Sequence, residues 1–206
     1  MTDQPLHGLR LWVTRPSNQA AALITLLSNA GAEVLALPLL EIAPPLDSAP
    51  LADALERLSE FDIAVFVSPS ALDAVMGRLH GQWPHHLAAA VMGPGSALKA
   101  RALGLPHIIA PTSQFDSDGL LQLPAMQALA GKNVVLFQGD GGRETLPETL
   151  LARGARLTRV AAYRRLPPAF DHDYLQAQLA ADCAGVIISS SEAVQYLFDL
   201  GRGATL

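Results

Sequence analysis

The chain has 206 residues, of which 50% are hydrophobic and 16% charged, and its formal net charge is −5 at pH 7. This composition excludes a disordered protein, and the length suits one large domain or two of roughly 100 residues. The acidic balance argues against a nucleic-acid partner, because such binding depends on Lys and Arg side chains that neutralise phosphates. The single cysteine, Cys183, excludes an internal disulfide and a thiolate metal cage.

The N-terminus and the most apolar segment predict neither a secretory leader nor a membrane partner. Residues 1–8 have no basic flank followed by an apolar block. The segment Val34–Leu46 is interrupted by three prolines and by Glu41, so it falls short of the ~20 apolar residues of a membrane span. We therefore expect a cytoplasmic protein.

The predicted elements alternate between strand and helix along the chain. Strands are expected at Leu9–Val13, Val34–Leu40, Ile63–Val67, Ala88–Met92, Ile108–Ala110, Val134–Phe137, Leu157–Tyr163 and Gly185–Ile188. Helices are expected at Ala20–Asn29, Leu51–Leu58, Ser70–Leu79, Ala97–Leu103, Asp118–Ala130, Leu146–Arg153, Tyr174–Ala181 and Ser191–Leu200. This alternation predicts an α/β fold with parallel sheets and helices on both faces.

The sequence also shows an internal repeat. The segment Gly8–Val13 aligns with Gly131–Leu136 at an offset of 123 residues, and the alignment continues without gaps. Further on, Ser68 aligns with Ser189 at an offset of 121. Any two βαβ units share such a rhythm, but the long ungapped agreement favours duplication. The second copy would need roughly 30–50 further residues to match the first, so we expect part of it to lie beyond Leu206.

Two Pro-rich stretches indicate domain boundaries. Pro38–Pro50 and Leu166–Pro168 stand at the same phase of the repeat. If both are crossovers, the chain leaves a first domain, builds a second one and then returns. The predicted arrangement is a discontinuous domain 1 of residues 1–39 and 167–206, a domain 2 of residues 44–162, and connector segments 39–44 and 163–168.

Five loops follow predicted strands and precede predicted helices, which is where open parallel sheets bind ligands. They share small residues, hydroxyls or glycines at a helix N-terminus, where free N–H groups suit carboxylates and phosphates. The loops are Thr14-Arg15-Pro16-Ser17, Ser68-Pro69-Ser70-Ala71, Gly93-Pro94-Gly95-Ser96, Gly139-Asp140-Gly141-Gly142-Arg143 and Ser189-Ser190-Ser191-Glu192. The same residue types are ordinary helix caps. Their recurrence in five equivalent places favours a shared anion-binding site.

Other chemistries are not indicated by the sequence. Gly93-Pro94-Gly95-Ser96 is not a dinucleotide motif, because Leu98 stands in the place of the third glycine. The sequence has no metal-ligand spacing and no Ser–His–Asp pattern, so we expect neither a metal nor a covalent nucleophile. An enzyme built in this way would act by holding and shaping its substrate.

Short motifs in a fixed order carry a family resemblance. They are Val13–Pro16, Phe66–Ala71, Val91–Ala97, Asp118–Leu121, Gly139–Leu146, Val160–Arg164 and Ile188–Ser191. Their order and spacing resemble the uroporphyrinogen-III synthase family over essentially the whole chain. The resemblance implies two flavodoxin-like domains joined by a two-stranded connector, with the substrate in the cleft between them.

The resemblance also implies an activity. It is the cyclisation of hydroxymethylbilane to uroporphyrinogen III with inversion of ring D, a lyase reaction of haem biosynthesis that loses water and needs no cofactor. Tyr163 matches the connector tyrosine that the family favours as the acid for hydroxide departure. The family precedent is a monomer.

Substrate-binding residues are expected in all five loops. Ser96 matches a Thr or Ser of the family that contacts the substrate, and Arg15 and Arg143 are expected to pair with its carboxylates. The expected set is Thr14, Arg15, Ser68, Pro69, Ser70, Ala71, Gly93, Pro94, Gly95, Ser96, Gly139, Gly142, Arg143, Ser189, Ser190 and Ser191. Two alternatives stay open: a non-catalytic two-lobed protein that binds an anionic metabolite, and a nucleotide or flavin enzyme that uses Gly139–Gly142.

Overall fold

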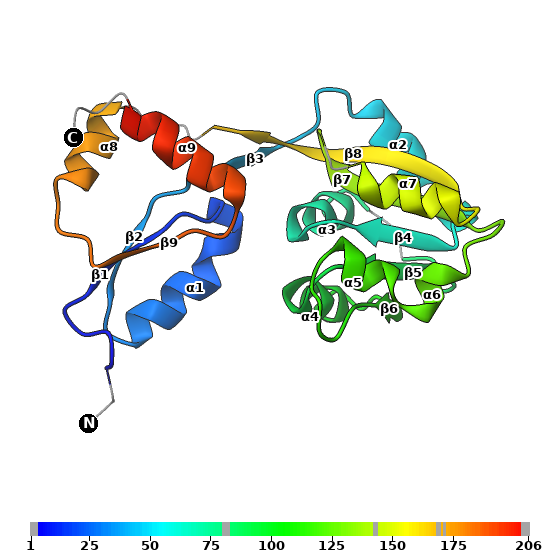
Figure 1. The fold of residues 1–206 in the computed structure, drawn as a ribbon, viewed down its shortest axis with the longest axis horizontal. Coiled ribbons are helices and arrows are strands. Elements are labelled where there is room, and N and C mark those ends of the chain that lie inside the picture. The colour runs from blue at the N-terminus through cyan, green and yellow to red at the C-terminus, as the bar shows by residue number, and fades with distance from the viewer. Residues whose placement is uncertain (1–3, 80–82, 142–143, 168–169, 171, 203–206) are drawn as a thin grey trace. The chain divides into compact units, whose positions relative to one another are not determined.

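A computed structural model describes residues 4–79, 83–141, 144–167, 170 and 172–202. The chain forms two compact units (Figure 1): unit 1 comprises Met1–Ile42 and Arg165–Leu206, and unit 2 comprises Ala43–Arg164. The chain passes into unit 2 through β3 (Glu41–Ala43) and returns through the end of β8 (Arg156–Leu166). These two strands are neighbours in one sheet. Unit 1 is therefore built from two separate segments of the chain.

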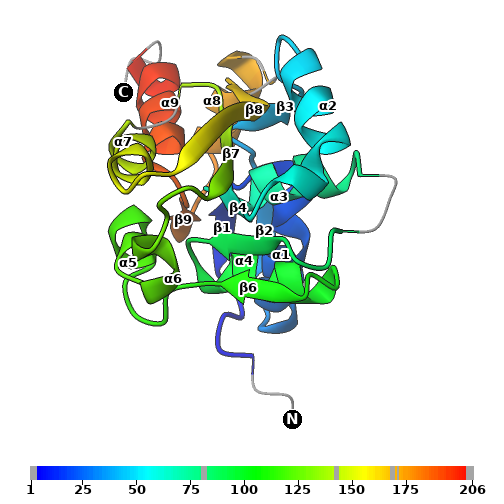
Figure 2. The same cartoon turned by 90° about the vertical axis from the view of Figure 1, so that its right-hand side faces the viewer.

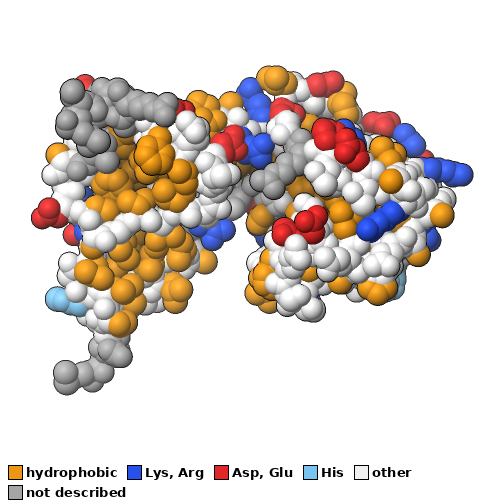
Figure 3. Space-filling view, in the orientation of Figure 1, with side chains coloured by type: hydrophobic (Ala, Val, Ile, Leu, Met, Phe, Trp, Pro, Cys, Tyr) orange, Lys and Arg blue, Asp and Glu red, His pale blue; other side chains and the backbone are white. Residues whose placement is uncertain are grey.

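Unit 1 contains a three-stranded sheet in the order β2-β1-β9, and both strand pairs are parallel. The strands are β1 (Arg10–Val13), β2 (Glu33–Ala36) and β9 (Gly185–Ile187), and the helices are α1 (Ser17–Asn29), α8 (His172–Leu179) and α9 (Ser191–Arg202). Trp12, Leu37 and Leu175 form its buried cluster, against which Cys183 packs. In Figure 3, hydrophobic side chains gather on the visible face beside α9 and α1. Leu26, Val186 and Phe198 are among the exposed large apolar residues of this unit.

Unit 2 contains a parallel sheet in the order β8-β7-β4-β5-β6, with β3 added beside β8. Its other strands are β4 (Ile63–Phe66), β5 (Ala88–Val91), β6 (His107–Ile109) and β7 (Asn133–Gly139). Its helices are α2 (Ala49–Glu56), α3 (Pro69–Met76), α4 (Pro94–Ala102), α5 (Ser117–Leu121), α6 (Pro124–Gln127) and α7 (Thr145–Ala152), with a 3₁₀ turn at Leu58–Glu60. Figure 2 shows α5, α6 and α7 on one side of this sheet and α2 and α3 on the other.

The central strand β4 is buried on both faces of the sheet. Ile63 and Val65 join a cluster that includes Leu120 of α5 and Leu150 of α7. Because side chains alternate along a strand, Phe66 points to the opposite face, where its ring stacks on that of Phe137 with centroids 5.3 Å apart. A fully apolar strand is what a parallel sheet covered by helices on both faces requires.

The strand registers confirm that the two units share a repeated pattern. Arg10 lies opposite Glu33 where β1 pairs with β2, and Asn133 lies opposite Arg156 where β7 pairs with β8. Both pairs are related by the offset of 123 that the sequence predicts. The glycine that follows α1 and the one that follows α7 also both have positive φ, 97° and 82°.

The last part of the repeat has an offset of 122, so the predicted offset of 121 is wrong by one residue. In unit 1, Leu11 lies opposite Gly185, and the equivalent residue of unit 2, Val134, lies opposite Ile63. Gly185 and Ile63 are therefore the equivalent residues of β9 and β4. The run of three serines after β9 allowed the sequence alignment to shift by one residue, because each serine matches Ser68 equally well.

Helix caps give the same correction. Ser68 Oγ accepts a hydrogen bond from the Ala71 N–H at 3.1 Å at the start of α3. Ser190 Oγ accepts one from the Ala193 N–H, also at 3.1 Å, at the start of α9. The residue equivalent to Ser68 is therefore Ser190 and not Ser189.

The differences between the predicted elements and the structure include a divided helix, a shortened strand and an additional strand. The helix expected over Asp118–Ala130 is divided into α5 and α6, because Pro124 has no N–H to continue a helix and instead begins a new one. The second strand ends at Ala36 rather than Leu40. The short strand β3 was not predicted, since three residues beside prolines give no alternating pattern.

Candidate functional site

Tyr163 lies at the carboxyl end of β8, and its side chain is buried, with 4% of its surface exposed. It lies opposite Gly139 after a register shift between Gln138 and Gly139 in β7. The Asp140 N–H donates to the Tyr163 carbonyl oxygen at 3.0 Å. The end of β7 therefore fixes the backbone that carries this tyrosine.

Gly139 leaves the space in which the Tyr163 ring lies. A Cβ atom on Gly139 would be 2.9 Å from Cζ and 3.0 Å from Cε2 of the ring, and 3.2 Å from its hydroxyl oxygen. Real Cβ atoms almost never approach other heavy atoms below 3.0 Å. A residue with a side chain at position 139 would therefore displace the phenol.

Ser68 lies at the carboxyl end of β4 and bonds to the same phenol. Its hydroxyl donates to the Tyr163 hydroxyl oxygen at 2.9 Å, and its oxygen accepts from the Ala71 N–H. A phenol oxygen that accepts a hydrogen bond can still donate its own proton to another group. Tyr163 is thus arranged so that its proton remains available.

The other predicted residues of unit 2 lie around the starts of α3 and α4. Pro69 and Pro94 occupy the first turns of these helices, and Ser70, Ala71 and Ser96 are buried. Gly93 caps α4 with no side-chain hydrogen bond. A Cβ on Gly93 or on Gly95 would meet nothing within 4 Å. The start of α4 therefore has open space around both glycines.

The loop after β7 is anchored where it enters α7. Arg159 of β8 makes two hydrogen bonds to the Glu144 carboxylate, at 2.7 and 2.8 Å. The hydrogen bond from Arg159 holds the pKa of Glu144 below its ordinary value. Gly142 and Arg143 lie outside the described residues. Their expected roles stay predictions.

The predicted residues of unit 1 lie at the carboxyl ends of β1 and β9. Thr14 is 1% exposed, and its hydroxyl donates to the Ile187 carbonyl at 3.0 Å, so it ties β1 to β9. Arg15 has a buried Nε with no hydrogen-bond partner among the described residues. Ser190 caps α9, and Ser189 and Ser191 beside it are exposed.

A pocket of about 290 Å³ opens in unit 1 where the chain enters α1. It is lined by Pro16, Ser17, Asn18, Leu40, Glu41 and Ile42. Pro16 is the N-cap of α1 and makes no side-chain hydrogen bond to the first turn, which also has no acidic residue. At the offset of 123, Pro16 is equivalent to Gly139 and Leu40 to Tyr163. The pocket is therefore lined by the sequence equivalents of both Gly139 and Tyr163.

The structure thus brings Ser68, Gly139 and Tyr163 together in unit 2, and it places Pro16, Ser17 and Leu40 around one pocket in unit 1. Sequence reasoning missed Gln138, a polar residue of β7 that is 9% exposed and lies opposite Ala161 beside Gly139. A polar residue directly after the apolar run of β7 was the signal that could have identified it.

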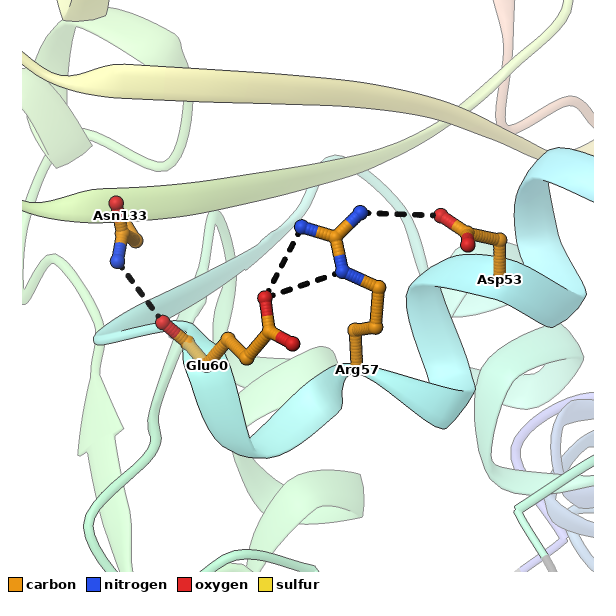
Figure 4. Close-up of polar contacts among 4 residues, drawn as sticks. All are labelled: Asp53, Arg57, Glu60 and Asn133. Carbon is orange, nitrogen blue, oxygen red and sulfur yellow. Dashed lines mark hydrogen bonds and ion pairs between the residues drawn. The ribbon is translucent and has the colours of Figure 1, made fainter.

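A second pocket, of about 350 Å³, lies at the amino ends of β7 and β8, opposite the end that carries Tyr163. In Figure 4, Arg57 lies between Asp53 and Glu60, and Asn133 donates its side-chain amide to the Glu60 carbonyl oxygen. These bonds raise the pKa of Arg57 above its ordinary value. The charge of Arg57 is therefore paired with two carboxylates, and Arg156 also lines this pocket.

Comparison with known proteins decides the family. A profile described as "Uroporphyrinogen-III synthase HemD" matches residues 21–205. The chain is 32% identical over 197 residues to the uroporphyrinogen-III synthase of Escherichia coli K12, covering 93% of this chain and 80% of that protein. The chain belongs to the uroporphyrinogen-III synthase family. The resemblance predicted from the sequence motifs is therefore confirmed.

Other members of the uroporphyrinogen-III synthase family support the same assignment. The protein of Synechococcus elongatus is 32% identical over 202 residues, covering 95% of this chain and 75% of that protein. A mutant Thermus thermophilus uroporphyrinogen III synthase superposes with a TM-score of 0.58 at 20% identity, over 93% of this chain and 77% of that one. The Helicobacter pylori uroporphyrinogen-III synthetase gives a TM-score of 0.55 at 14% identity, over 93% and 78%. At these identities the solved structures show a shared two-domain α/β fold.

Membership of the uroporphyrinogen-III synthase family makes this chain an enzyme of tetrapyrrole synthesis. A non-catalytic binding protein is accordingly not favoured. Within the described ranges, no group of three or more His, Cys, Asp and Glu side chains could hold a metal ion. Over the same residues, no helix combines the length and the apolar character needed to cross a bilayer.

Proposed function

We propose that this chain cyclises hydroxymethylbilane to uroporphyrinogen III with inversion of ring D. Family membership supports the substrate and the product. The observation that carries the chemistry is the buried phenol of Tyr163, held at the carboxyl edge of the unit 2 sheet by Ser68 and Gly139. This edge is where parallel sheets place their reactive groups.

Tyr163 would act as the general acid. The ring A nitrogen supplies the electron pair that expels the terminal hydroxide, the C–O bond breaks, and the Tyr163 proton completes a molecule of water. The resulting protonated azafulvene is attacked by the substituted carbon of ring D. The spiro intermediate then fragments at the bond that links ring D to ring C, and ring D recloses inverted through its free carbon, whose proton is lost and balances the one that Tyr163 gave. A positioned general acid typically contributes about 10²–10⁴-fold in rate.

The helix N-termini would hold the carboxylates of the substrate. Hydroxymethylbilane carries eight carboxylates, and an acidic protein can bind them through backbone N–H groups at helix starts. Support comes from the uncapped starts of α1 and α4 and from the open space around Gly93 and Gly95. Arg15, Arg143 and the remaining predicted loop residues, apart from Ser68 and Gly139 beside Tyr163, complete the proposed set.

The finer architecture is proposed on the same basis. Numbered along the chain, the unit 2 order β8-β7-β4-β5-β6 reads 5-4-1-2-3. It becomes the flavodoxin-like order 2-1-3-4-5 by circular permutation, when the count starts at β7 and passes from β8 to β4. We propose that the two units function as domains, 1–39 with 167–206 and 44–162, joined by 39–44 and 163–168. A lyase that acts as a cytoplasmic monomer without a cofactor stays our prediction.

The test is an isomer assay. Freshly prepared hydroxymethylbilane cyclises without an enzyme to the symmetric type I isomer, so the ratio of isomers reports catalysis directly. The proposal predicts type III product in excess when the protein is added, at a rate proportional to protein concentration. Type I product alone would instead support a binding protein, and a flavin spectrum in the purified protein would support the flavin alternative.

A further inference from the structure

We propose that Ser68 is a positioning residue for Tyr163. Together with Gly139 it holds the phenol in the orientation needed for proton transfer. This inference rests on the proposed function, because it concerns how the same acid is held. It separates Ser68 from the predicted substrate-binding residues. The Ser68 hydroxyl acts on the substrate through Tyr163 and not by direct contact.

Both hydrogen bonds of Ser68 are accounted for within the protein. Its oxygen accepts from the Ala71 N–H at 3.1 Å, and its proton goes to the Tyr163 oxygen at 2.9 Å. A serine hydroxyl has a single proton. It therefore has none left to donate to a substrate carboxylate while the bond to Tyr163 exists.

The repeat shows that the second bond is not needed for capping. Ser190 caps α9 through Ala193 with the same 3.1 Å bond, and the residue equivalent to Tyr163 in that unit is Leu40. A serine at this position therefore caps a helix without any tyrosine. The bond from Ser68 to Tyr163 is an addition found in unit 2.

The residue that the Tyr163 ring packs against also differs between the two units. Gly139 of unit 2 corresponds to Pro16 of unit 1, where a side chain stands beside Leu40 in the lining of the pocket. Gly139 lies in an extended strand whose backbone does not require glycine. The close approach of the Tyr163 ring is thus what excludes a side chain at this position.

The Ser68 hydroxyl lies at the oxygen atom from which the proposed proton transfer starts. When Tyr163 gives its proton to the departing hydroxide, its oxygen becomes negative, and the Ser68 hydroxyl already points at it. A hydrogen bond to a charged oxygen is stronger than one to a neutral oxygen. Ser68 therefore stabilises the transition state more than the ground state, so its loss should lower kcat and leave KM nearly unchanged.

The kinetic test compares Ser68→Ala with Ser68→Thr. Loss of a hydrogen bond to a charged group predicts a fall in kcat of about 10- to 100-fold for Ser68→Ala. Ser68→Thr keeps the hydroxyl in an extended backbone that suits a β-branched residue, so it should restore most of the activity. Asp116→Ala is the matched control, because it removes a similar cap, the 2.9 Å bond from the Gly119 N–H, away from Tyr163.

The outcomes of the kinetic test distinguish a failure of the positioning role from a failure of the proposed function. An unchanged kcat in Ser68→Ala, a failed rescue by Thr, or an equal fall in Asp116→Ala would overturn the positioning role. A wild-type protein that makes no type III isomer would overturn the proposed function itself. The two failures are therefore distinguishable.

The contact between Gly139 and the Tyr163 ring is tested by measuring the stability of the folded protein. Gly139→Ala should lower the urea midpoint when Tyr163 is present, because the new Cβ meets the ring. The same substitution in a Tyr163→Leu background, which copies the residue of unit 1, should be nearly neutral. Equal effects in both backgrounds would show that the ring does not depend on Gly139 and would overturn this part of the inference.

Discussion

Leu40 of unit 1 and Tyr163 of unit 2 are equivalent residues of the repeat, 123 positions apart. The sequence offset of 123 relates the two residues, and the strand registers show the same offset between the paired residues of β1 and β2 and those of β7 and β8. Both side chains are buried. A repeated βα framework therefore carries a buried phenol in one copy and a pocket in the other.

For the pocket of unit 1, we predict that one substitution raises the stability of the protein and weakens its binding of substrate. Asn18→Asp places a negative charge in the first turn of α1, which should stabilise the helix by about 0.3–1 kcal/mol through the macrodipole. If the pocket receives a substrate carboxylate, the same charge repels it, so KM should rise while kcat stays the same. Urea unfolding and steady-state kinetics measure the two effects, and Asn18→Ser is the neutral control. An unchanged KM would show that the pocket takes no anionic group.

Gly119 and Gly95 are predicted to respond oppositely to alanine. A Cβ on Gly119 would run into the main-chain carbonyl group of Gln114, so Gly119→Ala should destabilise unit 2 by about 1–3 kcal/mol. A Cβ on Gly95 meets nothing within 4 Å, and Gly95→Ala in α4 should stabilise by about 0.5–1 kcal/mol. Thermal unfolding of the two variants checks both signs. Two shifts of the same sign would be inconsistent with this packing.

Asp62 should make stability depend on pH. The Asn133 N–H donates to its carboxylate at 2.8 Å, and this bond, with help from Lys132, holds the pKa of Asp62 below its ordinary value. Folding therefore favours the ionised form. The stabilisation is present above the unfolded pKa, about 3.9, and is lost as the pH falls through the lower folded pKa.

The variant Asp62→Asn measures this contribution. At neutral pH it should unfold more easily than the wild type by about 1 kcal/mol, a modest value because the carboxylate is partly exposed. The difference should shrink below about pH 4. Glu56→Gln removes an exposed carboxylate and serves as the control. A difference that stays constant down to acid pH would contradict the pKa shift.

Much of the fold could be predicted because its strands are short apolar runs bounded by glycines. The helix α1 illustrates what periodicity leaves out: it begins at Ser17, three residues before the predicted start, because polar first-turn residues carry no apolar period. Pro124 was visible in the sequence, yet its effect on the predicted long helix was underestimated.

The contact between Ser68 and Tyr163 could not have been predicted from spacing. The two residues are 95 positions apart and are brought together by the order of β4, β7 and β8 in the sheet. Likewise, the glycine content of the loop after β7 suggested a phosphate loop. The structure shows that Gly139 is required because a ring lies against it.

The most direct test of the proposed acid compares the rate of type III product formation by Tyr163→Phe with the rate of the control variant Tyr174→Phe. The first variant keeps the ring on Gly139 and loses only the hydroxyl, whereas the second alters a partly exposed tyrosine of α8 in unit 1. We predict a fall in kcat of about 10²–10⁴-fold for Tyr163→Phe and wild-type turnover for Tyr174→Phe. A Tyr163→Phe protein with wild-type turnover would contradict the claim that this phenol is the acid.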